Sequence, residues 1–212
     1  MKSLLTLLLL AFTFNAFAQK EDKIDADKDY VITIKTAYGD MIVLLSDNAP
    51  LHKANFVKLV KSGFYDSTTF HRVIDGFMIQ GGDTLSKDNI PTNDGMGNIG
   101  YTIPAELTTG LKHKKGAIAA ARIGDQMNPQ RASNGSQFYI VLDDQGASHL
   151  DGQYSVYGQV VEGLNVMGKI AEQQTDNRNR PLDNVYMTMK VEEMKRSKIM
   201  KKYNAKSFYE GK

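Results

Sequence analysis

The chain has 212 residues and carries 26 Lys and Arg against 24 Asp and Glu, with no cysteine. The near balance of charge argues against a general polyanion binder, and we expect no nucleic-acid partner. The absence of cysteine excludes disulfides and lipid attachment at a cysteine. The length is enough for one well-packed domain.

The first 18 residues predict a signal peptide. A basic start is followed by an apolar run over residues 4–14, and small residues lead to a cleavage site after Ala18. The run is shorter than the roughly 20 apolar residues of a membrane span, and Asn15 interrupts it. We therefore expect an exported protein, periplasmic or secreted, with no membrane span after cleavage. Residues 19–29 are charged and are expected to form a flexible leader.

The next segments predict a hairpin and a helix. Residues 30–36 and 41–45 have the composition of strands joined by a turn at 38–40. Asp47 or Asn48 would cap a helix that begins with a proline in its first turn and runs to about residue 62, before a terminating glycine. Its inward side is expected to be Ala54, Val57 and Val60 or Leu51, Phe56 and Leu59.

Residues 69–83, with the sequence TFHRVIDGFMIQGGD, predict two strands separated by a glycine. Strict alternation would place Phe70, Arg72 and Ile74 on one face. In the second strand it would place Phe77 with Ile79 on one side and Met78 with Gln80 on the other. Arg72 stands in an otherwise apolar strand, where an unpartnered guanidinium is costly.

The polar residues 84–100 predict a long loop. Glycines at 95, 97 and 100 match the dinucleotide-binding pattern, but that pattern must open a helix, and Pro104 opposes one here. Residues 116–122 are a small apolar run, and residues 123–133 are a polar loop. Two strands are expected at residues 137–142 and 157–161, followed by a helix at 164–171 and a polar turn at 176–181. The last strand covers residues 185–191, with Val185, Met187, Met189 and Val191 inward.

Many short strands and only two helices predict an antiparallel β-barrel or β-sandwich. Residues 194–212 form a basic tail, with seven basic residues against one acidic from Lys195 onward. Such a run is typical of a solvated, helical tail, and the alternative is weak attraction to an anionic membrane or partner surface.

The segment 69–83 is similar to the signature of cyclophilin-type peptidyl-prolyl cis-trans isomerases. Three further blocks resemble the same family in order: Asn134–Ile140, Leu150–Gly152 and Tyr157–Gly163. The resemblance implies a mainly β fold over residues 30–193, a closed eight-stranded antiparallel barrel capped by two α-helices. It also implies rotation about X-Pro bonds in unfolded or extended polypeptides, here those of other exported proteins.

The resemblance also implies the site. Arg72 would be the catalytic residue, donating to the amide nitrogen when the bond twists, a reaction that needs no metal or cofactor. An apolar wall would receive the proline ring, Gln80 and the backbone of Arg122 would hold the preceding residues, and Gln137 would support Arg72 or the chain. The wall residues would be Phe77, Met78, Tyr139 and Leu150, with Gly95 and Ala121 keeping the groove open and Tyr154 beside it.

Three positions depart from the family pattern. Tyr139 replaces the usual Phe, His149 stands where many members have Trp, which makes strong cyclosporin sensitivity doubtful, and Tyr154 replaces a common His. Each alters affinity more than mechanism. We expect a monomer.

Other functions are open from the residues alone. A cyclophilin-like module could hold proline-containing segments without catalysis, and a barrel with an open interior could carry an apolar molecule. A hydrolase triad of His71, Asp75 and Ser136 is disfavoured, because no nucleophile elbow surrounds the serine.

Overall fold

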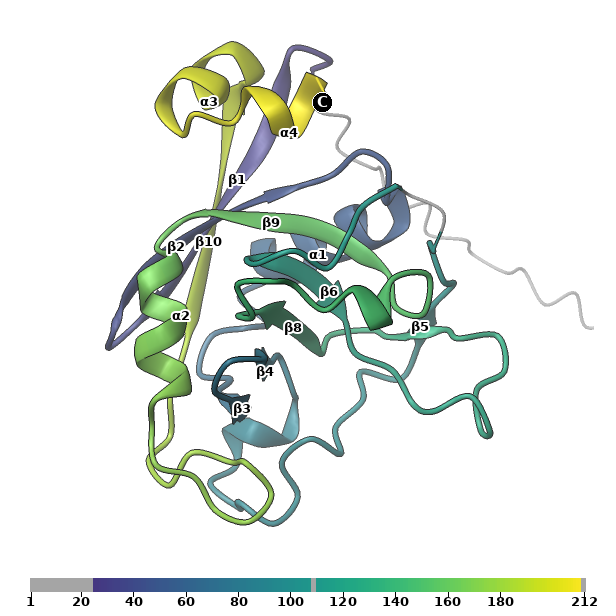
Figure 1. The fold of residues 1–212 in the computed structure, drawn as a ribbon, viewed down its shortest axis with the longest axis vertical. Helices are drawn as coiled ribbons and strands as arrows, with labels where there is room; N and C mark the ends of the chain where they lie inside the picture. Colours follow the sequence, from purple (N-terminus) through teal and green to yellow (C-terminus); the bar gives the residue numbers. More distant parts are fainter. Residues whose placement is uncertain (1–24, 108–109, 211–212) are drawn as a thin grey trace, which may run out of the picture.

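The computed structural model describes residues 25–107 and 110–210, and its main element is one sheet of eight antiparallel strands (Figure 1). The strand order is β10-β1-β2-β9-β6-β8-β4-β3. The strands are β1 (Lys28–Thr36), β2 (Gly39–Leu45), β3 (Phe70–Ile74), β4 (Met78–Gly81), β6 (Ala117–Ala120), β8 (Phe138–Val141), β9 (Val156–Glu162) and β10 (Thr188–Lys195). The expected hairpin at residues 38–40 joins β1 to β2. The predicted signal peptide lies outside the described residues.

The sheet curls strongly, so that its two edge strands meet. Next to β3 and β10, Thr69 and Tyr186 form an isolated antiparallel bridge. The backbone N–H of Phe70 donates to the Val185 carbonyl at 2.9 Å, and that of Met187 to the Thr68 carbonyl at 2.9 Å. The expected mainly β fold of eight antiparallel strands with helices is confirmed as a strongly curled sheet, whose edges are joined by these few contacts and by no continuous strand pairing.

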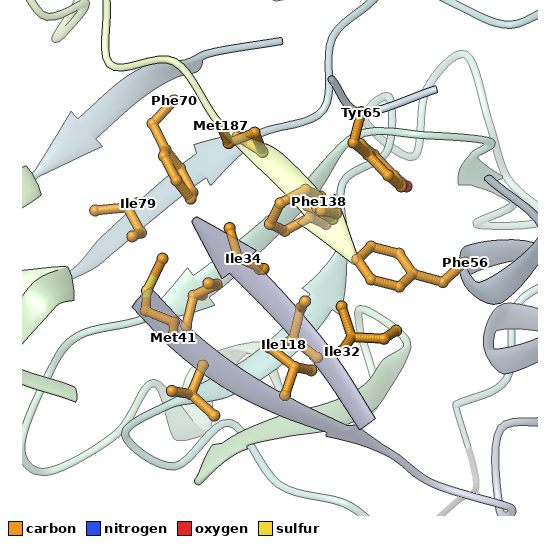
Figure 2. Packing of buried hydrophobic residues seen from close by; sticks show 14 of the residues in the cluster. Ile32, Ile34, Met41, Phe56, Tyr65, Phe70, Ile79, Ile118, Phe138 and Met187 are labelled. Atoms are coloured by element: carbon orange, nitrogen blue, oxygen red, sulfur yellow. The ribbon is translucent and has the colours of Figure 1, made fainter. Parts of the chain in front are cut away.

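Large apolar side chains fill the interior of the curled sheet (Figure 2). Phe138 is fully buried and lies edge-on to Phe56, with ring centroids 5.5 Å apart. The expected inward positions of the last strand are confirmed, because Val185, Met187 and Met189 are buried and Val191 packs against the same cluster. A filled interior is the opposite of what a carrier of an apolar molecule would need.

Two helices, well apart in the view of Figure 1, both add buried side chains to this interior. They are α1 (Pro50–Lys61) and α2 (Leu164–Ala171), and the bounds of α2 are those expected. In α1 the buried apolar residues are Phe56, Val57, Leu59 and Val60, as expected. Leu51 and Ala54 are exposed, so the prediction was wrong for these two.

The start of α1 is capped by a residue far along the chain. The position before the helix is Ala49, and no side chain of that segment caps it, so the prediction of Asp47 or Asn48 was wrong. Instead, the Glu106 carboxylate accepts the backbone N–H groups of Leu51 and His52, each at 3.0 Å. Free N–H groups and the helix dipole at a helix start favour such an anion.

Strict alternation fails in β3 and at the turn after it. The register shifts between Phe70 and Arg72, so Phe70 packs in the interior while Arg72 lies on the outer face. A bulge of this kind moves a side chain to the other face. Phe77 belongs to the turn before β4, and it packs with Met78 instead of with Ile79. Both assignments from the sequence were wrong for this reason.

Four short elements were not predicted from the sequence. Residues Leu85–Lys87, in the loop 84–100, form a 3-10 helix, η1. A second 3-10 helix, η2, is formed by Ser148–Leu150. A separate two-stranded sheet pairs β5 (Thr102–Ile103) with β7 (Ser133–Asn134). Two-residue strands give no periodic signal, so the sequence did not predict them.

The basic C-terminal segment packs on the outer face of β1 and β2. It forms α3 (Arg196–Lys202) and α4 (Lys206–Glu210), at the top of Figure 1. Ile199 and Tyr203 are buried against Val31 and Leu44. The tail is therefore helical with one buried side, and the division of the chain at residues 30 and 193 stays a prediction. In the described part of the chain, no helix has the length and apolarity to cross a membrane.

Candidate active site

Arg72 lies on the outer face of the β3–β4 hairpin, directly opposite Gln80 in the strand register. Its Nη1 donates to Gln80 Oε1 at 3.3 Å and lies 4.0 Å from the Met78 sulfur. The side chain is half-buried, and no ion pair joins it to a carboxylate of the described residues. The guanidinium is therefore held in place by neutral groups.

A chain of amides connects this arginine to the loop 84–100. Gln80 Nε2 donates to Gln137 Oε1 at 3.1 Å, and Gln137 Nε2 donates to the carbonyls of Gly95 at 3.1 Å and Gly97 at 2.9 Å. A Cβ on Gly97 would lie 1.8 Å from the Asp83 carboxylate, so only glycine fits there. Gln137 was predicted to support Arg72 or the chain. In the structure Gln137 does not contact Arg72 directly, because Gln80 lies between them and is hydrogen-bonded to both.

An apolar cluster lies beside Arg72 on the outer face of β4, β6 and β8. Tyr154 meets Tyr139 edge-on with ring centroids 5.9 Å apart, and Phe77 stacks on His149 at 6.0 Å. All five aromatic and apolar residues that the sequence assigned to the pocket or its border are in this cluster: Phe77, Met78, Tyr139, Leu150 and Tyr154.

Ala121 and Arg122 follow β6 and border the cluster. The backbone of Ala121 donates to Gln137 at 3.0 Å and accepts from Asn134 at 2.8 Å. The Arg122 guanidinium lies 4.4 Å from the centre of the Tyr154 ring, and its Nε donates to the Gln153 carbonyl at 2.9 Å. Its side chain thus covers Tyr154, and substrate binding by its backbone stays a prediction.

A hollow of about 330 Å³ opens on the other side of Arg72. Its lining includes Gln80, Gly95 and His71, and burial lowers the pKa of the His71 imidazole. A buried ion pair between Arg180 and Asp94, 2.6 Å long, joins the residue before Gly95 to the segment before β10. This pair was not predicted from the sequence, because residues 176–181 carry only the signal of a polar turn.

His113, which was not predicted as part of the site, is buried behind the apolar cluster. It lies between the Tyr139 hydroxyl and the Asp151 carboxylate. Asp151 was inside one of the family-like blocks, but His113 lies in a basic stretch with no pattern that indicates a buried imidazole. Among the described residues, no group of three or more His, Asp and Glu side chains is placed to hold a metal ion.

The comparisons with known proteins agree with this geometry. The family model "Cyclophilin type peptidyl-prolyl cis-trans isomerase/CLD" matches residues 31–191. A peptidyl-prolyl cis-trans isomerase of Helicobacter pylori is 40% identical over 144 residues, covering 66% of this chain and 79% of that protein. The isomerase cypE of Dictyostelium discoideum is 36% identical over 158 residues, covering 74% and 94%.

Other relatives are much longer. The chain spans 26% of peptidyl-prolyl cis-trans isomerase-like 2 of Rhizopus delemar and 37% of a bifunctional phosphatase/isomerase of Streptococcus pyogenes. A crystal structure of a cyclophilin-type isomerase from Cryptosporidium parvum has a TM-score of 0.66 and 29% identity, covering 78% of this chain and 98% of that one. The chain therefore belongs to the cyclophilin-type peptidyl-prolyl cis-trans isomerases, enzymes that act on peptide bonds preceding proline.

Proposed function

We propose that this chain accelerates cis-trans rotation about X-Pro bonds, with Arg72 as its catalytic residue. The barrier to rotation is about 18–20 kcal/mol, because the C–N bond is partly double. In the twisted state the nitrogen loses conjugation and accepts a hydrogen bond. A donor that meets this nitrogen only in the twisted state lowers the barrier without any bond being made or broken.

The observation that carries this proposal is the setting of Arg72. Its guanidinium is always charged, and here it is fixed by Gln80 and Met78 without a carboxylate partner. An arginine that only stabilised the fold would be expected to pair with an acid, as Arg180 does with Asp94. Arg72 therefore keeps donors for a substrate, while the amide chain through Gln137 holds its orientation.

The apolar cluster supplies the other half of the mechanism. Proline is apolar and rigid, so a wall of aromatic and thioether groups would hold the ring while the preceding residue turns. Met78 and Tyr139 are largely buried, and Phe77 and Leu150 are partly exposed at their edge. The Cryptosporidium parvum enzyme has also been crystallised in the presence of the dipeptide Ala-Pro. That structure is 28% identical to this chain in sequence and has a TM-score of 0.65.

The test is cis-to-trans exchange of an Ala-Pro peptide followed by NMR, with the wild type, Arg72→Ala, Arg72→Lys and Arg196→Ala. Arg196 is the matched control, since it pairs with Asp47 near the C-terminal helices. We expect Arg72→Ala to lose about 100-fold or more in kcat/KM, Arg72→Lys to recover only part, and Arg196→Ala to match the wild type. Peptide binding without exchange by the wild type would leave a binding module. Equal exchange by Arg72→Ala would refute the role of Arg72.

We further propose that the enzyme assists the folding of exported proteins. The support is the N-terminal pattern of a basic start, an apolar run and small residues before Gln19. N-terminal sequencing of the protein recovered from its cells, after fractionation, is the test. A protein in the periplasm or medium that begins at Gln19 would support the proposal, and an intact N-terminus in the cytoplasm would refute it.

A further inference from the structure

The ring of Tyr139 in the apolar cluster is tied at its far end. Its hydroxyl lies 2.9 Å from Nε2 of His113, and the two rings are nearly parallel, with an interplanar angle of 10°. Both residues are buried. The hydroxyl at this position, where the family usually has Phe, is thus engaged by His113.

Asp151 fixes the imidazole in turn. One of its oxygens, Oδ1, accepts from the backbone N–H of His113 at 2.9 Å and lies 2.8 Å from His113 Nδ1. A carboxylate that holds both backbone and ring allows one orientation of the imidazole. Asp151 directly follows Leu150, which is itself part of the cluster, so one short segment supplies both a wall residue and this anchor.

The protonation state follows from the same contacts. Burial lowers the pKa of His113, and although Asp151 opposes this, the nearby Lys112 and His149 do not. The imidazole is therefore neutral at pH 7, with its Nδ1–H donated to Asp151 and its Nε2 free to accept. The remaining acceptor takes the O–H of Tyr139, whose pKa burial raises. All three groups are satisfied in one arrangement only.

We propose that His113, held by Asp151, is a positioning residue that fixes the Tyr139 ring as the wall of the proline pocket. This inference rests on the proposed isomerase function. A ring held at both ends is pre-organised, so substrate binding does not have to order it. In this proposal the contacts among Asp151, His113 and Tyr139 affect the binding of proline and have no part in the hydrogen bond that Arg72 donates.

A double-mutant cycle tests whether His113 positions Tyr139, with the variants His113→Leu, Tyr139→Phe and the two together. Each single change leaves a buried polar atom without its partner, whereas the double change replaces both by apolar groups. We expect each single variant to raise KM for the Ala-Pro peptide about three- to tenfold with little change in kcat. Because each single change already breaks the same contact between His113 and Tyr139, the double variant should lose no more than either single variant. Losses that multiply in the double variant would overturn the proposal.

The matched control is a second buried histidine with the same chemistry. His52 lies between the carboxylate of Glu106, 2.5 Å from Nδ1, and the hydroxyl of Ser133, 2.9 Å from Nε2, but it is outside the apolar cluster. His52→Leu should lower the melting temperature and leave KM unchanged. An equal rise in KM in His52→Leu would show that loss of any buried histidine loosens the pocket, and would refute a positioning role for His113.

A third readout does not need turnover. The ring signals of His113, followed by NMR, should report the Nδ1–H tautomer in the wild type and should titrate differently in Tyr139→Phe. A His113 titration that is unchanged in Tyr139→Phe would overturn the inference whether or not the protein catalyses rotation. A wild type without isomerase activity would refute the proposed function alone, since the titration of His113 would still decide whether His113 holds Tyr139.

Discussion

Phe138 and Tyr139 are neighbours on β8, but their side chains lie on opposite faces of the sheet. Phe138 points into the filled interior, where it meets Phe56, Tyr65 and Phe70. Tyr139 points to the outer face, in the cluster beside Arg72. The same contrast holds in β4 for Ile79 and its two outward neighbours. Alternation along a strand thus places stability on one face and the candidate chemistry on the other.

This contrast has a consequence for mutation. A change on the inner face should alter the free energy of unfolding and leave the chemistry of the folded molecules intact. A change on the outer face should do the reverse. A variant that changes both the free energy of unfolding and the activity of the folded molecules by similar amounts would show that the two faces are coupled at that residue.

Phe138→Ala is expected to have the largest effect. It removes a fully buried ring at the centre of an aromatic group and leaves a cavity, so the free energy of unfolding should fall by about 3–5 kcal/mol. Urea denaturation measures this loss. The kcat/KM of the molecules that remain folded should stay within about twofold of the wild type. A loss below about 1 kcal/mol would show that the interior is loosely packed.

Glu106→Gln should cost about 2 kcal/mol of stability. The neutral amide can accept only part of what the carboxylate accepts from the first turn of α1 and from His52 Nδ1. The matched control is Asp144→Asn, because that carboxylate is exposed and its pair with Lys115 should contribute little. Equal losses of stability in the two variants would mean that Glu106 stabilises the fold no more than an exposed carboxylate does.

Gln80→Ala is expected to lower kcat/KM about tenfold, which corresponds to about 1.4 kcal/mol in the activation barrier. The change frees Arg72 from its amide partner and separates it from Gln137. The melting temperature should change little, because Gln80 lies on the outer face. Gln159→Ala, which removes a half-buried glutamine on the far strand β9, is the control and should leave the activity unchanged. Wild-type activity in Gln80→Ala would show that the amide does not orient Arg72.

The smallest expected effect is on the pH dependence of stability. Burial lowers the pKa of His52, His71 and His113 in the folded state. The unfolded chain then binds more protons as the pH falls through about 6.5, so stability is full above that pH and declines below it. Denaturation at pH 7.5 and 6.0, a range in which carboxylates stay ionised, should show a loss of order 1 kcal/mol at the lower pH. A stability that is constant or rises toward pH 6.0 would contradict the burial of these neutral imidazoles.

The sequence predicted the parts of the molecule that follow local rules. The strands of β1, β2, β9 and β10, the helix α2 and the wall residues of the cluster all came from periodicity or from short family-like blocks. What failed depended on contacts between distant residues. A bulge sends Phe70 inward, Glu106 caps a helix 55 residues away, and Arg180 pairs with Asp94 across 86 positions.

The site shows the same limit. Arg72, Gln80 and Tyr139 were identified because they stand in recognisable stretches of sequence. His113 was not, since its role depends on a partner 26 residues away and another 38 residues away. A residue's neighbours in space decide whether an imidazole is a surface group or a buried acceptor, and a single sequence does not contain that list.

The pairing of β1 with both β2 and β10 has a consequence for how the chain folds. Lys28 lies opposite Lys195, so the first strand acquires its second partner only when the last strand is available. Contacts this distant in sequence close large loops and slow the search for the native topology. Until β10 docks, β1 is an open edge whose free N–H and C=O groups can pair with other chains. We therefore expect the folding chain to be open to aggregation along β1 for as long as β10 has not docked.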